Sequence, residues 1–257
     1  MTVLIDSHCH LDLTPLAEDL DAVLARAQAA GVGQMLIPAI DRAHWQGLEQ
    51  LSVRPELQVA IGLHPVFEHD VNADIEALSA RLEQPHPFIA IGECGLDKVA
   101  GRLPLTAQIE LFNAQLLLAN QHCLPIILHV RQAHNELLQQ LKANPPLAGG
   151  IVHGFSGGIE LAKQYRRFGI LIGIGGVCTY PRAAKTRKMV AELPLDGFVL
   201  ETDSPDMPLS GFQGQPNQPA QLPLVVAEVA SLQQRSLEQV IAAQQQNWQR
   251  LFPHWGL

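Results

Sequence analysis

The chain has 257 residues, a formal net charge of −8 and a hydrophobic content of 47%. This length can bury a large core, either as one α/β barrel or as two small domains. The apolar runs are far shorter than the ~20 residues that cross a bilayer, which excludes a membrane-spanning protein. The acidic balance argues against a nonspecific nucleic-acid-binding module, because such a module usually carries a basic face.

Cysteine spacing and the first residues bear on the cellular compartment. The four cysteines are far apart and form no C-x-x-C pair, which argues against a disulfide framework and a structural zinc site. Asp6, His8 and His10 interrupt the region where a secretion signal would be basic and then apolar. We therefore expect a cytoplasmic protein. No heptad or long unpaired apolar stretch is present, so we expect a monomer without an obligate protein partner.

Short apolar runs alternate with longer amphipathic segments, and this alternation predicts parallel strands connected by helices. The expected strands are residues 3–7, 34–38, 58–63, 88–93, 125–129, 150–153, 170–173 and 197–201. The expected helices include residues 16–30, 105–122, 133–143, 220–232 and 237–251. A repeat of roughly 32 residues is typical of a (β/α)8 TIM barrel. We predict a single domain over residues 1–257, with the Gly-, Pro- and Gln-rich segment 207–223 as its eighth βα loop.

Histidine and acidic residues recur where the expected strands end. His8 and His10 follow the first strand in LIDSHCH, and side chains two residues apart on an extended segment point the same way. Similar positions end the third, fourth, fifth, sixth and eighth strands: His64 in GLHP, Glu93 in IGECGLD, His129 in ILHV, His153 in IVHGFSG and Asp203 in LETDSP. Because these ends open onto one face of a barrel, we expect the side chains to converge there.

Each of these residues, taken alone, has a more ordinary explanation. A single histidine at a strand end is more often a hydrogen-bonded structural residue than a ligand, and Glu93 could cap the next helix. Their recurrence favours a shared partner, because burying many polar groups without one is costly. Imidazole and carboxylate ligands suit zinc and manganese, and magnesium where more oxygen donors are present. We therefore expect two divalent metal ions.

The remaining histidines and the cysteines near the candidate ligands are interpreted as structural. The six histidines in helices or loops are expected at the surface: His44, His69, His86, His122, His134 and His254. Cys9 and Cys94 flank candidate ligands, but strand alternation turns their side chains away. We expect both thiols to pack in the core and favour this over a nucleophilic role.

Six motifs in chain order resemble the TatD family of metal-dependent deoxyribonucleases, in its TatD-like branch, among the amidohydrolase-like metallohydrolases. They are DSHCHLD, GLHP, GECGLD, ILHVRQA, HGFSG and ETDSP, and they run from Asp6 to Pro205. The resemblance implies a barrel fold and cleavage of DNA phosphodiesters, in some members as 3′ to 5′ exonucleases. After GLD the family often continues with an aromatic residue, whereas this chain reads KVAGRLP, so the fourth loop differs.

The resemblance also implies roles for the residues at the strand ends. One metal ion would be held by His8, His10 and Asp203, a second by His129 and His153, with Glu93 bridging both. His64 corresponds to an active-site histidine close to the bound phosphate. A two-metal site activates a water for attack on phosphorus, and we expect Asp203 also to accept that water's proton.

Glu201 lies two residues before Asp203, on the same face of the expected strand. It either orients a metal-bound histidine or is a buried acid paired within the barrel. The sequence favours neither role over the other.

A phosphodiester substrate needs cations beside the metal ions. The segment TYPRAAKTRK, after the seventh strand, contains the densest basic run: Arg182, Lys185, Arg187 and Lys188. Lys98, Arg102 and Arg131 follow the fourth and fifth strands. Basic side chains bind phosphates, and an aromatic ring such as Tyr180 stacks on a base or sugar. For any single one of these residues, a position at the solvated start of a helix is an equally good explanation. We expect substrate binding by His64, Arg131, Tyr180, Arg182 and Lys185, and catalysis by His64, Glu93 and Asp203.

Two other functions compete with a nuclease that acts on DNA or an oligonucleotide. The same metal pair could hydrolyse a small phosphoester, a lactone or a cyclic amide, because barrel loops set the substrate. A binding protein could keep the metal site without turnover. The basic run and the glutamate on the fourth strand favour phosphodiesters, while DNA and RNA stay unresolved because no residue recognisably reads the 2′-hydroxyl.

Overall fold

The structure is a computed structural model of the chain, and it describes residues 3–254. Eight strands form one sheet in the order β1 to β8. They are β1 (Leu4–Asp6), β2 (Val32–Pro38), β3 (Leu57–Ile61), β4 (Phe88–Asp97), β5 (Ile126–Arg131), β6 (Gly150–Val152), β7 (Ile170–Ile174) and β8 (Phe198–Leu200). The strand pairs described are parallel, so each connection must return along the sheet, and helices make these returns.

The helices follow the strands in alternation. They are α1 (Leu20–Ala29), α2 (Trp45–Leu51), α3 (Val71–Leu82), α4 (Leu105–Gln121), α5 (His134–Ala143), α6 (Ile159–Arg166), α7 (Ala184–Glu192), α8 (Leu222–Gln233) and α9 (Leu237–Leu251). Side-chain caps begin several of them: Asp19 accepts from Ala22 N–H at α1, and Ser236 forms a capping box with Gln239 at α9. Contacts divide the chain into two compact units. The first unit contains β1, β2, β7, β8, α1 and α6 to α9, and the second unit contains β3 to β6 and α2 to α5.

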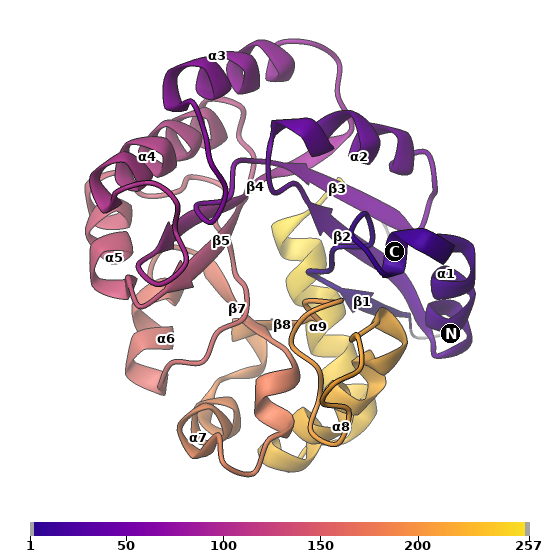
Figure 1. Ribbon diagram of the computed structural model, residues 1–257. Helices are drawn as coiled ribbons and strands as arrows, with labels where there is room; N and C mark the ends of the chain where they lie inside the picture. Colours follow the sequence, from indigo (N-terminus) through magenta and orange to yellow (C-terminus); the bar gives the residue numbers. More distant parts are fainter. Residues whose placement is uncertain (1–2, 255–257) are drawn as a thin grey trace. The chain divides into compact units, whose positions relative to one another are not determined.

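In the first unit, β8 lies beside β1. The Ser7 N–H donates to the Leu200 carbonyl over 3.0 Å, and β7 pairs with β8 on the other side. Helix α9 packs against β1 and β8, and α8 packs against α9 and α7, as Figure 1 shows. Asn247 on α9 donates to the Phe198 carbonyl at the start of β8 over 2.7 Å. These contacts hold the ends of β1 and β8 in register next to each other.

In the second unit, β3 to β6 form consecutive parallel pairs. Helix α4 packs on β4, and α3 packs on α4 (Figure 1). All ten residues of β4 are buried, and the register with β5 aligns Gly95 with His129. An irregularity between Ile91 and Cys94 interrupts this register, and irregularities of this kind re-aim side chains at active sites. The predicted end of this strand at residue 93 was wrong, because β4 continues to Asp97.

The predicted α/β barrel architecture is confirmed, with its eight strands and the long helices near the expected positions. The organisation as one domain stays a prediction. The segment expected as the eighth βα loop, residues 207–223, follows β8 and contains the short helix η5 (Pro219–Gln221), and its last two residues already belong to α8, which begins at Leu222. Across residues 3–254, the helices are too short or too polar for any of them to pass through a membrane.

Candidate metal centre

The first unit brings together three histidines and one aspartate from strand ends. His8 Nε2 lies 3.2 Å from His10 Nε2 and 3.5 Å from Asp203 Oδ1. The candidate ligand atoms of His8, His10 and Asp203 all lie within 4.8 Å of one another. The His153 ring stacks on His8 with centroids 3.9 Å apart, and its Nδ1 is 3.8 Å from Asp203 Oδ1. We call these four residues the first-unit cluster.

Hydrogen bonds between the segments after β1 and β8 position this cluster. The Asp203 N–H donates to the His8 carbonyl over 2.9 Å, and the His10 N–H donates to the Ser204 carbonyl over 2.7 Å. Asp6 accepts from the Thr202 N–H over 2.9 Å and from the Thr202 hydroxyl over 2.6 Å. The backbone of Asp203 has a φ of +56°, a left-handed conformation that aspartate tolerates better than most residues. The ligand geometry is therefore set by the protein framework itself.

The second unit holds another group, made of His64, Glu93, His129 and Asp97, which we call the second-unit cluster. The ligand atoms of its first three members lie within 4.8 Å of one another. Glu93 Oε1 lies 2.9 Å from His64 Nε2 and 3.0 Å from His129 Nδ1. His64 Nδ1 accepts the Val66 N–H over 3.1 Å, so the proton of the neutral ring is on Nε2 and is donated to Glu93.

Asp97 is a member of this cluster that the sequence analysis missed. Its Oδ2 lies 3.0 Å from His129 Nε2, and its Oδ1 accepts the N–H groups of Val99 and Ala100 over 2.7 Å each. Burial alone would raise the pKa of Asp97, but the hydrogen bonds from His129, Ala100 and Val99 outweigh burial and hold this pKa well below its usual range. Glu93, Gly95 and Asp97 alternate along the sequence, which places them on one face of a strand, and this spacing was the available signal.

A buried polar residue secures the backbone of Asp97. Gln108 on α4 accepts the Asp97 N–H over 2.8 Å and donates to the Asp97 carbonyl over 3.0 Å. The same amide nitrogen donates to the Leu103 carbonyl over 2.8 Å. Gln108 thus fixes the end of β4 and the loop that follows it, so the Asp97 carboxylate is held against His129.

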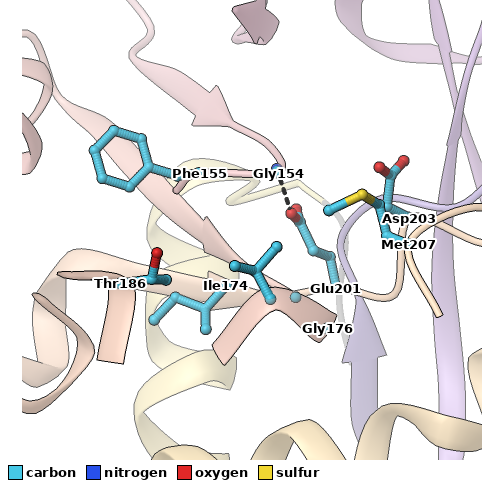
Figure 2. A pocket seen from close by; sticks show the side chains of 10 residues that line it. Gly154, Phe155, Ile174, Gly176, Thr186, Glu201, Asp203 and Met207 are labelled. Atoms are coloured by element: carbon cyan, nitrogen blue, oxygen red, sulfur yellow. Dashed lines mark hydrogen bonds between the residues drawn. The ribbon is translucent and has the colours of Figure 1, made fainter. Parts of the chain in front are cut away.

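Two buried acids beside the first-unit cluster indicate how a cation would fit. Burial raises the pKa of Asp6 to about 7, opposed by the Thr202 hydrogen bonds. Burial raises the pKa of Glu201 to about 8, opposed by the charge of His153. Glu201 Oε1 accepts the Gly154 N–H over 2.6 Å, as Figure 2 shows, whereas its Oε2 has no hydrogen-bond partner among the described residues. The charge of Asp203 also raises both pKa values, so a divalent cation bound beside these carboxyl groups would favour their ionised forms.

The donor set of each cluster also fits a metal ion. Imidazole nitrogens and carboxylate oxygens are the ligands that zinc and manganese take in hydrolases, and each cluster offers three of them within reach of one ion. Whether Glu93 bridges two ions, and whether His153 shares an ion with His129, stay predictions.

The thiols and one loop histidine have structural roles. Cys9 Sγ donates to the Leu36 carbonyl and Cys94 Sγ donates to the Ile127 carbonyl, and burial raises the pKa of both thiols. The expectation that both pack in the core is confirmed. The surface position expected for His69 was wrong, because its side chain is only 1% exposed and its Nε2 lies 2.8 Å from the His64 carbonyl.

The basic side chains divide into paired and available groups. Arg187 donates to Glu228 over 2.5 Å, Lys188 lies 3.8 Å from Glu192, and Lys98 pairs with Glu136. Arg182 and Lys185 are exposed and form no ion pair within the described part of the chain, and Arg131 is exposed at the end of β5. The Arg182 guanidinium carbon lies 5.0 Å from the Tyr180 ring centroid. The sequence alone could not separate these groups, because the pairing partners lie on other turns or helices.

Histidine and carboxylate groups at the strand ends of an α/β barrel are typical of the metal-dependent hydrolases with this fold. A family model described as TatD related DNase matches residues 5–253. The chain belongs to this family, and it is a metal-dependent hydrolase.

Individual relatives support the same assignment. The chain is 41% identical to the uncharacterized metal-dependent hydrolase YjjV of Escherichia coli K12, over 96% of this chain and 97% of that protein. The crystal structure of that TatD homolog matches with a TM-score of 0.94 and covers 98% of this chain and 99% of that one. The chain is also 33% identical to the 3′-5′ ssDNA/RNA exonuclease TatD of Erwinia billingiae, over 89% of this chain and 91% of that protein.

Proposed function

We propose that the protein hydrolyses phosphodiester bonds in DNA or oligonucleotides, as a 3′ to 5′ exonuclease that uses two divalent metal ions. The observation that carries the proposal is the presence of groups of histidine and carboxylate side chains whose ligand atoms lie within 4.8 Å of one another, among them one group in each unit. Two sets suit the chemistry of phosphodiester cleavage, in which both the attacking and the leaving oxygen need stabilisation. The Erwinia relative named as a single-strand exonuclease supports the choice of substrate.

The proposed ligands follow the strand ends. One ion would be held by His8, His10 and Asp203, the other by His129 and His153, with Glu93 as a ligand of both. When bound, zinc, manganese or magnesium supplies Lewis acidity to the phosphoryl group and lowers the pKa of water.

The chain's own residues supply proton transfer and orientation. Asp203 lies 3.5 Å from His8 Nε2 and is partly exposed, with 14% of its side chain accessible, so its second oxygen can take a proton from a water at the cluster. His64 holds a proton on Nε2. This N–H would donate a hydrogen bond to a phosphate oxygen when substrate is bound, whereas in the structure it donates to Glu93 Oε1 over 2.9 Å.

The available cations are assigned to the substrate backbone. Arg131, Arg182 and Lys185 would contact phosphates, and Tyr180 would contact a base or sugar. A cytoplasmic location is proposed because the free cysteines suit a reducing compartment. A monomer is proposed because the sequence contains no heptad or long unpaired apolar stretch.

Digestion of end-labelled single-stranded and duplex DNA, with magnesium, manganese and zinc in turn, tests the proposal. A ladder that shortens from the 3′ end is the expected result. A panel of small phosphoesters, lactones and cyclic amides is run beside it. Hydrolysis confined to that panel would replace the nuclease assignment, and metal binding without turnover of any substrate would favour a binding protein.

A further inference from the structure

A cleft in the first unit lies between the segments that follow β7 and β8. Its lining consists of Val177, Tyr180, Arg182, Ala183, Met207 and Pro208, and its volume is about 270 Å³. Val177 and Met207 also line the cavity that contains the Glu201 and Asp203 carboxylates. Figure 2 shows this cavity, with Met207 among the residues that line it. The cleft therefore shares a wall with the cavity of the proposed ligand Asp203.

Hydrogen bonds hold the two sides of the cleft together. The Tyr180 hydroxyl donates to the Pro208 carbonyl over 2.6 Å, and the Ser210 N–H donates to Thr179 Oγ1 over 2.9 Å. Asn217 Nδ2 donates to the Met207 carbonyl over 3.2 Å. The shape is thus set by the protein, which lowers the entropy cost of ordering these groups around a ligand.

The lining combines a ring, a thioether and one guanidinium. Arg182 lies over the Tyr180 ring, with its guanidinium carbon 5.0 Å from the ring centroid. Met207 is 38% exposed, and its backbone φ of +52° is a conformation that few residues other than glycine adopt. Thioethers contact aromatic ring edges favourably, and a guanidinium group binds the phosphate that a nucleotide carries. An apolar cleft with one cation suits a flat aromatic ring that is joined to a negatively charged group.

We propose that this cleft holds the nucleobase adjacent to the scissile phosphate. The inference rests on the proposed phosphodiesterase function, which places that phosphate near Asp203, and the shared wall of Val177 and Met207 leads from there into the cleft. The cleft is slightly smaller than the ~300–1,000 Å³ of ordinary ligand pockets, so one ring system fits better than a longer chain. Its side chains recognise the face and edge of a ring, so the site accepts any base in DNA or RNA.

The test compares two labelled thymidine octamers, one with all its bases and one with an abasic 3′-terminal residue. The readout is the ratio of kcat/KM for the two probes, which cancels the phosphate contacts that they share. Loss of one stacked base is expected to lower kcat/KM about 5- to 100-fold in the wild type. Met207→Ala should bring this ratio towards one, whereas Met207→Leu, which nearly conserves the volume, should keep most of it. Arg182→Gln removes a phosphate contact that both probes share, so it should lower kcat/KM for both and leave the ratio unchanged.

The controls are matched changes far from the cleft in sequence. Leu147→Ala removes a side chain that is 74% exposed, and Arg235→Gln removes an exposed cation, so both should retain the wild-type ratio. A wild-type ratio near one, or an unchanged ratio in Met207→Ala, would overturn the base site while leaving the nuclease function in place. Absence of cleavage of both probes by the wild type would remove the nuclease function, and the base site with it.

Discussion

His129 is held between two carboxylates: its Nε2 lies 3.0 Å from Asp97 Oδ2 and its Nδ1 lies 3.0 Å from Glu93 Oε1. Asp97 is almost fully buried and is itself fixed by two backbone N–H groups, so its position depends little on solvent. A carboxylate in this position can accept the Nε2–H of the ring, which would leave Nδ1 as the nitrogen for the proposed metal ion. It also raises the basicity of that nitrogen.

Replacing Asp97 by Asn should therefore weaken metal binding. The Asn side-chain oxygen can still accept the Val99 and Ala100 N–H groups, but the charge that supports His129 is lost. Carboxylate partners of this kind typically contribute about 10- to 100-fold in metal affinity. Titration of the chelated protein with zinc or manganese, followed by calorimetry, measures the loss directly.

Glu110→Gln is the control for that titration, because it removes an exposed acid from α4 in the same unit. Equal metal affinity in Asp97→Asn and Glu110→Gln would show that Asp97 does not support the metal site. Thermal unfolding of both variants separates a loss of affinity from a loss of fold.

The fold was largely predictable because buried parallel strands and amphipathic helices have different apolar periods. His8 and His10 were predictable as a pair because a spacing of two sets their common direction. Asp97 was not recognised, because its function depends on the length of β4 and on the register that aligns Gly95 with His129. Ion pairs such as Arg187 with Glu228 could not be predicted either, because they join residues on different helices.

The chelated protein should lose stability as the pH rises from about 4 to 8. Burial raises the pKa of Asp6 from 3.8 to about 7 and that of Glu201 from 4.5 to about 8. In this window the folded state keeps protons that the unfolded state has released, so the free energy of unfolding falls with pH. The slope is at most about 1.4 kcal/mol per pH unit for each group.

Urea unfolding at pH 5, 6, 7 and 8 with a chelator measures this slope. Glu201→Gln cannot ionise at this position, so its slope should be smaller. Bound divalent metal lowers both pKa values, and the loaded protein should lose less stability over the same range. A free energy of unfolding that is constant or rises with pH in the chelated wild type would contradict the assignment of two buried acids with raised pKa values.

Asp203→Asn should abolish turnover to a much greater degree than it weakens metal binding. The amide keeps one oxygen as a possible ligand, but it cannot accept a proton from the attacking water. Loss of a general base typically costs about 10²- to 10⁴-fold in rate. Parallel measurement of kcat on DNA and of metal content separates the two effects, and an Asn variant with normal kcat would refute the role of Asp203 as base.

Joint replacement of Arg182 and Lys185 by Gln should weaken the binding of single-stranded DNA and leave metal content intact. Both side chains are exposed without an acidic partner among the described residues, whereas Arg187 and Lys188 are paired with Glu228 and Glu192. Each phosphate contact contributes about 0.7 to the slope of log affinity against log salt concentration, so two lost contacts lower this slope by about 1.4.

The matched control for that pair is Lys142→Gln with Arg235→Gln, which changes the net charge equally but removes cations on α5 and between α8 and α9. Affinity is measured by fluorescence anisotropy between 50 and 200 mM salt, on the metal-loaded proteins. If the two double variants lose affinity equally, the effect comes from net charge. A larger loss of affinity and of salt slope in the Arg182 and Lys185 variant alone would place the nucleic acid against the segment after β7, because a local contact depends on position and net charge does not.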